Sequence, residues 1–321
     1  MKEITILLEG DGKNIAQLLK NYQIEYGVKI NIHDVPRETL MEHIGTVDAD
    51  IVITSVCNEL EIAKRKGFLL KANIEVPSQI ENSLYDPDNY WFAYAYRVRS
   101  LFYRRDQINL SQLTTYEDLS NPKWKGKLAI RKMHHKYCYA FISWMIERNG
   151  EEFVQQWLKD VRNNLAIAPF GGDTNQAQLI SKGAGQVAMV NSYYMHELLN
   201  AYDTRYVAMM LGMFFPNQHN GGSFRLLNGL AILEKTTNKD EAEKFINYML
   251  SFLPQQSHTD RSGQYSVRND ILIPKGIQAY AFEQHNVLDG MPIISNISIA
   301  KQVDNYEIAI RIINESNFDG E

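Results

Sequence analysis

The chain has 321 residues, enough for two domains of ordinary size. Apolar residues make up 45% of it and charged residues 22%, which is typical of a globular protein and excludes a disordered chain. The formal net charge of −5 argues against a nucleic-acid partner and against an acidic membrane surface.

The first residues carry no signal peptide, because Met1 to Glu3 lead directly into a predicted strand. The protein is therefore either cytoplasmic or a mature form with an added methionine. Cys57 and Cys138 are far apart, which excludes a zinc-type spacing and a disulfide scaffold. We interpret them as two small buried hydrophobic residues, with one long-range bridge as the alternative.

Predicted strands and helices alternate in the first part of the chain. Strands are expected at residues 3–8, 28–32 and 50–54, and helices at residues 14–26, 36–44 and 58–66. This alternation predicts βαβ units, a mostly parallel sheet and an α/β fold.

Two long strand-like runs follow, at residues 91–105 and 223–233. Strands of this length can cross between two lobes, so we expect two discontinuous lobes with a ligand cleft between them. The N-terminal lobe would contain residues 1–98 and 230–283, and the C-terminal lobe residues 99–229 and 284–321. Closure would be a hinge motion near residues 99–103 and 227–231.

The remaining elements are mostly helical. Helices are predicted at residues 116–119, 138–148, 151–164, 174–179, 239–252 and 306–313, and short strands at residues 128–131 and 186–190. Residues 133–137 are predicted to form a loop, and the stretch after residue 252 an irregular segment.

Two adjacent phenols, Tyr193 and Tyr194, lie where the strand at 186–190 ends and a helix at 195–199 begins. Asn191 or Ser192 would cap that helix. Ligands of open α/β sheets bind at such corners, and a helix N-terminus should make phenolate easier to form. A hard trivalent cation would displace the phenol protons. The alternative is one core tyrosine beside one surface tyrosine.

Enzyme motifs are absent from the sequence: it has no Gly-x-Ser-x-Gly elbow, phosphate-loop lysine motif, dinucleotide glycine fingerprint or His-Glu-x-x-His. His134 and His135 could bind a transition metal or be polar surface. The turn at residues 171–174 could hold an anion, or be only a tight turn with a helix cap. A metal-dependent hydrolase using His134, His135 and Asp173 remains an alternative.

Several motifs occur in the order found in one family. They are ADIVIT at residues 49–54, WFAYAYRVR at 91–99, LTTYEDL at 113–119, NPKWKGK at 121–127, NSYY at 191–194, FPNQ at 215–218 and YSV at 265–267. Over nearly its whole length the chain resembles the ferric-iron-binding periplasmic proteins of bacterial ABC importers. NPKWKGK is shared with transporters of other cargo, whereas NSYY with a tyrosine after Arg131 is more specific to iron.

The resemblance implies a set of site residues. Tyr193 and Tyr194 match the paired phenolate ligands, and Tyr137, six residues after Arg131, matches a third tyrosine of the tyrosine-rich branch. Arg99 matches a position that contacts an anion or sets the charge around the metal. Phenolate is a known protein ligand of iron, and three phenolates would cancel the charge of Fe(III).

The first strand departs from the family, which often presents a tyrosine and a histidine just after it. Here the sequence at that place contains Glu9 and Asp11 instead. Either carboxylate could act as an additional ligand, or water could fill the position.

The resemblance therefore implies a type II periplasmic solute-binding fold and a protein that carries Fe(III), with or without carbonate or another small anion, to an ABC permease of the inner membrane. We expect a periplasmic monomer that catalyses no reaction and binds no nucleic acid. The alternative is a binding protein of the same fold for a polyamine, thiamine or phosphate ester, with Arg97 and Arg99 in the ligand cradle.

Overall fold

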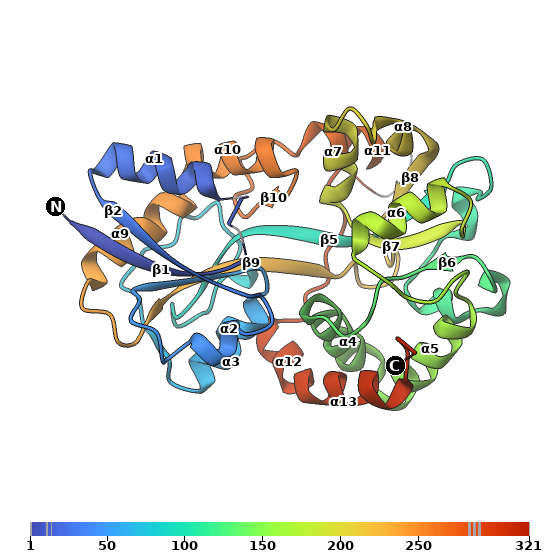
Figure 1. Cartoon of the computed structure of the whole chain (residues 1–321), viewed down its shortest axis with the longest axis horizontal. Coiled ribbons are helices and arrows are strands. Elements are labelled where there is room, and N and C mark those ends of the chain that lie inside the picture. The colour runs from blue at the N-terminus through green and yellow to red at the C-terminus, as the bar shows by residue number, and fades with distance from the viewer. Residues whose placement is uncertain are drawn as a thin grey trace. The chain divides into compact units, whose positions relative to one another are not determined.

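The computed structural model describes residues 2–10, 12–13, 15–281, 284, 287 and 290–320. The chain forms two compact units, which Figure 1 shows with their elements labelled. Unit 1 contains residues 1–96 and 226–272, and unit 2 contains residues 97–225 and 273–321. The lobe boundaries predicted from the sequence, and the cleft predicted with them, stay predictions.

Unit 1 is built on a mixed sheet with the strand order β2-β1-β3-β9-β5. Its strands are β1 (Glu3–Glu9), β2 (Lys29–Val35), β3 (Ile51–Thr54), β9 (Arg225–Leu233) and β5 (Phe92–Arg104), with the short β4 (Leu69–Leu70) on β9 and β10 (Tyr265–Ser266) on β5. β1 is parallel to β2 and β3, whereas β9 is antiparallel to β3. The parallel βαβ start of the chain is therefore confirmed.

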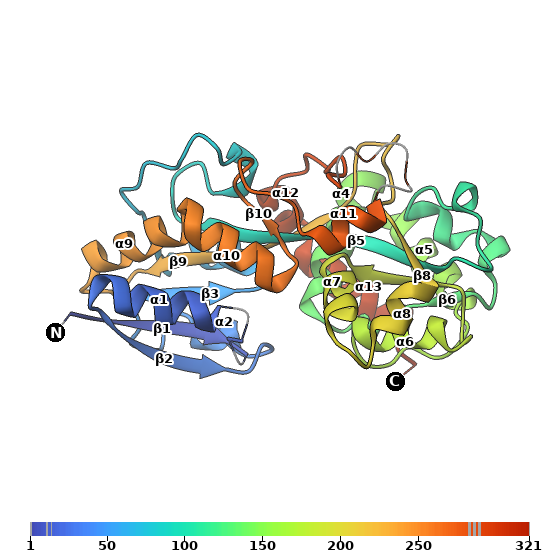
Figure 2. The same cartoon turned by 90° about the horizontal axis from the view of Figure 1, so that it is seen from above.

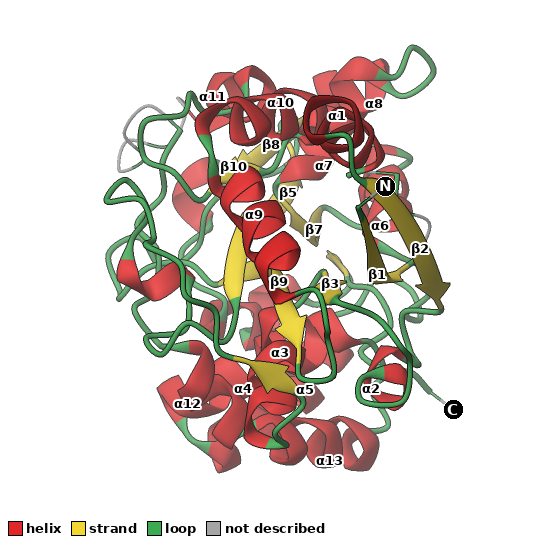
Figure 3. Ribbon diagram, turned by 90° about the vertical axis from the view of Figure 1, so that its left-hand side faces the viewer, coloured by secondary structure: helices red, strands yellow, loops and turns green. Residues whose placement is uncertain are grey.

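Helices cover both faces of this sheet. Figures 1 and 3 show α1 (Ala16–Tyr26), α9 (Lys239–Leu250) and α10 (Phe252–Ser262) on one face, and α2 (Leu40–His43) and α3 (Cys57–Arg65) on the other. Strand side chains such as Ile6, Leu7 and Ile51 are fully buried between these layers. Their burial supplies the main stabilising contribution of unit 1.

Unit 2 is built around the second half of β5, which is antiparallel to β7 (Val187–Asn191) and to β8 (Leu211–Phe214). The two-residue β6 (Leu128–Ala129) extends this sheet in parallel with β7. The register places Arg99 of β5 opposite Asn191, the last residue of β7.

Helices also cover both faces of the unit 2 sheet (Figures 1 and 2). One group contains α6 (Asp173–Ser181), α7 (Tyr193–Asn200), α8 (Arg205–Met210) and α11 (Lys275–Ala281), and the other contains α4 (Lys136–Asn149), α5 (Glu151–Asn163), α12 (Ile299–Asp304) and α13 (Tyr306–Ser316). None of the helices in the described ranges is both long and apolar enough to cross a membrane.

The predicted end of the helix at residues 239–252 is wrong, because α9 ends at Leu250. Ser251 has extended backbone angles, φ −80° and ψ 163°, and separates α9 from α10. Pro254 lies in the first turn of α10, where its missing N–H breaks no helical hydrogen bond. The irregular segment predicted after residue 252 therefore begins with a helix, Phe252–Ser262.

Candidate metal centre

The corner between β7 and α7 lies where the sequence places it. β7 ends at Asn191 and α7 begins at Tyr193, with Ser192 at the cap position. The Ser192 side chain makes no capping hydrogen bond. Instead its Oγ accepts from the Val98 backbone N–H at 3.3 Å, and its own N–H donates to the Val98 carbonyl at 2.9 Å. Ser192 therefore ties the corner to β5.

Tyr193 and Tyr194 stack on one another at this corner. Their ring centroids are 4.2 Å apart and the rings are inclined by 30°. Successive helical residues project about 100° apart, so stacking requires both side chains to turn toward the same side. Tyr193 is 9% exposed, and Tyr194 is half-buried. The pair therefore presents its two phenols together.

Tyr137 lies in the first turn of α4, so the loop predicted at residues 133–137 ends earlier than expected. His135 caps this helix: its Nδ1 accepts from the Tyr137 N–H at 3.2 Å, and its ring packs edge-on against Tyr137 at 4.4 Å. The guanidinium groups of Arg97 and Arg131 lie 4.5 Å and 5.7 Å from the centre of the Tyr137 ring. Tyr137 is thus buried and held beside two positive charges.

The three tyrosines are close enough to influence each other's ionisation. Burial raises the pKa of Tyr193 well above 10, and negative charge on Tyr194 and Tyr137 raises it further. Burial and then the charge of Asp173 raise the pKa of Tyr194 to about 12. Burial thus favours the protonated form of both phenols and opposes the effect expected of the helix start.

Arg99 is fully buried behind this corner. Its Nη1 donates to Asp173 Oδ2 at 2.5 Å, and Arg131 Nη1 lies 3.6 Å from Asp173 Oδ1. Burial would lower the pKa of Arg99, but its neighbours, Asp173 first among them, together raise it above its usual value, so the guanidinium stays charged. Arg99 Nη2 and Arg131 Nε have no hydrogen-bond partner among the described residues. The pairing of Asp173 with Arg99 has no sequence signal, because no motif joins two residues so far apart in the chain.

Glu9 lies in unit 1 at the end of β1 and is 7% exposed. Its Oε1 accepts from the Ser55 N–H at 2.7 Å and from the Ser55 hydroxyl, and its Oε2 accepts from the Thr54 hydroxyl at 3.1 Å. Both carboxylate oxygens therefore already have protein donors. Asp11, the other predicted carboxylate, lies outside the described residues.

The predicted hydrolase residues serve structural roles. His134 Nδ1 contacts Asp319 Oδ2 at 2.7 Å and its Nε2 contacts Asn314 Oδ1 at 2.8 Å, while Asp173 is engaged by Arg99. Within the part of the chain that the structure describes, no group of three or more His, Cys, Asp and Glu residues could hold a metal ion. Cys57 and Cys138 are buried and are not joined by a disulfide.

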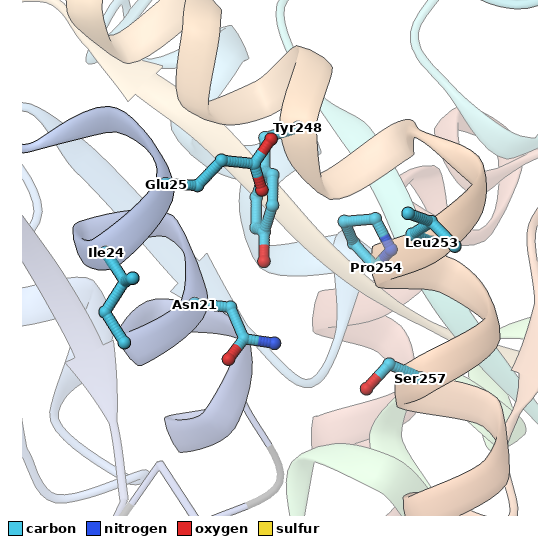
Figure 4. Close-up of a pocket in the computed structure, with 7 residues that line it drawn as sticks. All are labelled: Asn21, Ile24, Glu25, Tyr248, Leu253, Pro254 and Ser257. Carbon is cyan, nitrogen blue, oxygen red and sulfur yellow. The ribbon is translucent and has the colours of Figure 1, made fainter.

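A surface hollow of about 430 Å³ lies among α1, α9 and α10 in unit 1 (Figure 4). It is lined by Asn21, Ile24, Glu25, Tyr248, Leu253, Pro254 and Ser257. None of these residues was predicted to bind the cargo. Four of the seven side chains carry oxygen atoms, and one of these, Glu25, is a carboxylate.

Comparisons with known proteins show which family and which relatives this chain resembles. Residues 49–273 match the model of a family described as bacterial extracellular solute-binding protein. "Iron uptake protein A2" of Synechocystis sp. is 30% identical over 84% of this chain and 79% of its own length.

Two solved structures are also similar. A ferric binding protein from Campylobacter jejuni has a TM-score of 0.89 and 28% identity over 98% of this chain and 99% of its own. A Trichodesmium protein solved in complex with iron and citrate ligands has a TM-score of 0.87 and 26% identity over 98% of this chain and 99% of its own. These likenesses confirm the predicted type II solute-binding fold. The family model covers well over half of the sequence, and the chain therefore belongs to the family of bacterial extracellular solute-binding proteins.

Proposed function

We propose that this protein binds Fe(III) as cargo, with the phenolate oxygens of Tyr137, Tyr193 and Tyr194 as its protein ligands. The observation that carries the proposal is the stacking of Tyr193 on Tyr194 at the end of β7, with ring centroids 4.2 Å apart. Two segments, residues 137 and 193–194, bring the three phenols close enough that charge on one raises the pKa of another. Relatives and structural neighbours named for iron uptake and ferric binding support the same cargo.

The chemistry of the cluster suits a small ion of high charge. The pKa values of Tyr193 and Tyr194 are raised by burial and by neighbouring negative charge, so these two phenols stay protonated at neutral pH before iron binds. Fe(III) replaces the phenol protons, because its charge makes the three phenolates favourable neighbours. Each phenol releases one proton, and the three phenolates cancel the charge of the ion.

The remaining coordination positions are filled by a small anion or by water. Arg97 and Arg131 lie beside Tyr137 and place positive charge where an anion such as carbonate would bind. Arg99 acts from behind, through its ion pair with Asp173. Glu9 keeps its protein donors and contributes no ligand.

As a member of a solute-binding family, the protein would work outside the cytoplasm, in the periplasm, as a monomer that delivers iron to an ABC permease of the inner membrane. It catalyses no reaction. Release follows protonation of the phenolates or reduction, because Fe(II) is held less strongly by hard anionic oxygens.

An absorption measurement on the purified protein tests this proposal. Addition of Fe(III) as a nitrilotriacetate complex should produce a visible phenolate-to-iron charge-transfer band. Tyr193→Phe combined with Tyr194→Phe should remove most of the band, since Tyr137 alone then remains as a phenolate ligand. Tyr139→Phe is the matched control. Tyr139 lies on α4, as Tyr137 does, but it packs against Tyr306 with ring centroids 6.1 Å apart. A parent protein that stays colourless after Fe(III) loading would overturn the proposal.

The alternative of an organic or anionic cargo receives less support from the site. Its cradle would need Arg97 and Arg99, but Arg99 is buried on Asp173 and Arg97 lies over the ring of Tyr137.

A further inference from the structure

Asp173 is the first residue of α6, and its side chain is fully buried. A glycine turn places it there. Gly171 has a φ of +57°, and a Cβ at this residue would lie 2.4 Å from Asn175 Oδ1. That oxygen instead accepts the Gly172 N–H at 2.9 Å and so caps the helix start. The turn thus fixes the direction in which Asp173 enters the interior of unit 2.

The Asp173 carboxylate joins three segments of unit 2. Its Oδ2 accepts from Arg99 Nη1 at 2.5 Å and from the Asn191 backbone N–H at 3.2 Å, while its Oδ1 lies 3.6 Å from Arg131 Nη1. Burial would raise the pKa of Asp173, but Arg99 and Arg131 lower it below its usual range. The group is therefore an anion that holds β5, the end of β7 and the segment after β6 together.

Two of these contacts lead to the tyrosines. Asn191 precedes Tyr193 by two residues, and Arg131 lies 5.7 Å from the centre of the Tyr137 ring. One carboxylate thus reaches both segments that carry the phenols.

The end of β7 has no comparable support from its own side chain. Asn191 is fully buried, and neither its Oδ1 nor its Nδ2 has a hydrogen-bond partner among the described residues. Its backbone N–H is bonded to Asp173. Asp173 therefore supplies the side-chain contact of this strand end, in addition to the backbone pairing of Asn191 with β5 and the hydrogen bonds of Ser192 to Val98.

We infer that Asp173 is a positioning residue of the cargo site, which fixes Asn191 and Arg131 and thereby orients Tyr193, Tyr194 and Tyr137 without touching the ion. This inference rests on the proposed function. A site for a small hard ion is sensitive to the positions of its ligands, so loss of the carboxylate should change both the affinity for the ion and the spectrum of the bound ion.

The test compares Asp173→Asn with Glu117→Gln. Glu117 is a matched control, because its carboxylate also accepts from an arginine and an asparagine of unit 2, Arg148 at 2.7 Å and Asn217 at 2.8 Å. The probe is Fe(III)-nitrilotriacetate, titrated against the chelator and followed through the charge-transfer band. We expect Asp173→Asn to weaken iron binding about tenfold or more and to shift the band maximum, because it removes charge-assisted hydrogen bonds to Arg99 and Asn191. Glu117→Gln should match the parent in both respects.

Hydrogen exchange of the metal-free protein, measured by mass spectrometry, provides a readout independent of iron. Asp173→Asn should accelerate exchange in peptides covering residues 187–194, and Glu117→Gln should not. Asp173→Glu keeps the charge but lengthens the side chain. It provides a folded alternative if the asparagine variant does not fold, and it should also shift the band.

The inference is overturned if the Asp173 variants have the affinity, band and exchange of the parent. Equal losses of affinity in Asp173→Asn and Glu117→Gln with unshifted bands would also overturn it, because they would report a general loss of stability. If the parent forms no band, the proposed function fails. The exchange of residues 187–194 then still decides whether Asp173 holds the strand end: faster exchange in the variant supports that role and parent-like exchange overturns it.

Discussion

Two polar clusters of this protein lie where strands end, one in each unit, and they use their oxygen atoms differently. In unit 1, the carboxylate of Glu9, the last residue of β1, accepts hydrogen bonds from the N–H and the hydroxyl of Ser55. In unit 2, the phenols of Tyr193 and Tyr194 after β7 are held by stacking and burial. The carboxylate has its donors within the protein, whereas the phenols are placed by packing.

The difference teaches which oxygens are available to a cargo ion. A buried carboxylate with several donors loses those hydrogen bonds if it turns toward a metal, which costs about 1–3 kcal/mol for each donor left unsatisfied. A stacked phenol can exchange its proton for a cation while its ring stays in place. The unit 2 corner is therefore suited to bind a hard ion, and the unit 1 cluster is suited to stabilise its own fold.

The largest expected effect is a dependence of iron affinity on pH, which arises from the phenols of unit 2. The pKa of Tyr194 is raised to about 12 and that of Tyr193 well above 10, so below pH 10 both phenols are protonated before iron binds. Each phenolate ligand then requires the release of one proton, and three such ligands weaken binding by up to about a thousandfold for each unit of pH decrease. Chelator competition at several pH values measures this slope. A pH-independent affinity would exclude phenolate ligands.

The next effect concerns Tyr137. Tyr137→Phe removes one phenolate but leaves the ring between Arg97 and Arg131. Iron affinity should fall by more than about 10–100-fold, because a loss of that size is typical when only a residue behind a metal ligand is changed. The band of the remaining Tyr193 and Tyr194 ligands should persist. An affinity equal to that of the parent would remove Tyr137 from the ligand set.

A change in the unit 1 cluster should show the reverse pattern. Glu9→Gln keeps the shape of the side chain but loses charge-assisted hydrogen bonds from Ser55, so the free energy of unfolding should fall by about 1–3 kcal/mol. Iron affinity should remain within about threefold of the parent value, because Glu9 contributes no ligand. For scale, a factor of ten in affinity corresponds to about 1.4 kcal/mol. Urea unfolding and chelator competition provide the two readouts. A large loss of iron affinity with normal stability would make Glu9 a ligand.

The smallest effect is an alkaline loss of stability without iron. Buried tyrosines such as Tyr193, Tyr194 and Tyr265 have raised pKa values, whereas unfolded tyrosines titrate near about pH 10. Above that pH the unfolded chain loses protons that the folded protein keeps, so stability is present below about pH 10 and falls as pH rises toward about 12. Thermal unfolding across this range should show a decreasing melting temperature. Bound Fe(III) should make this decrease of the melting temperature smaller, because the phenols that bind the ion are already ionised.

Much of the fold could be predicted from the sequence, for reasons visible in particular elements. The strand at 186–190 and the tyrosine corner after it have a strong local signal, an apolar run followed by a helix. The helix at 252–262 was missed, because its proline in the first turn gives the same local signal as a helix end. Residues 133–137 were assigned to a loop, although His135 caps α4 and brings Tyr137 into the helix.

The site could be predicted less completely. The tyrosines were identified through adjacency and family resemblance, but the sequence offers no sign that Asp173 pairs with Arg99, 74 positions away. Such a pair forms only because β5 and β7 are neighbours and α6 begins beside them. The hydrogen bonds that occupy Glu9 depend in the same way on the pairing of β1 with β3. The long-range pairing of strands, and not local propensity, therefore determines which oxygen atoms are available to a cargo ion.

Resonance Raman spectroscopy of the Fe(III)-loaded protein tests the central claim most directly, namely that phenolates of unit 2 bind the ion and Glu9 of unit 1 does not. Excitation in the charge-transfer band should enhance tyrosinate vibrations in the parent. These should weaken in each of Tyr137→Phe, Tyr193→Phe and Tyr194→Phe, and stay unchanged in Glu9→Gln. Loaded protein without tyrosinate vibrations, or a spectrum altered by Glu9→Gln but not by the tyrosine changes, would contradict the account.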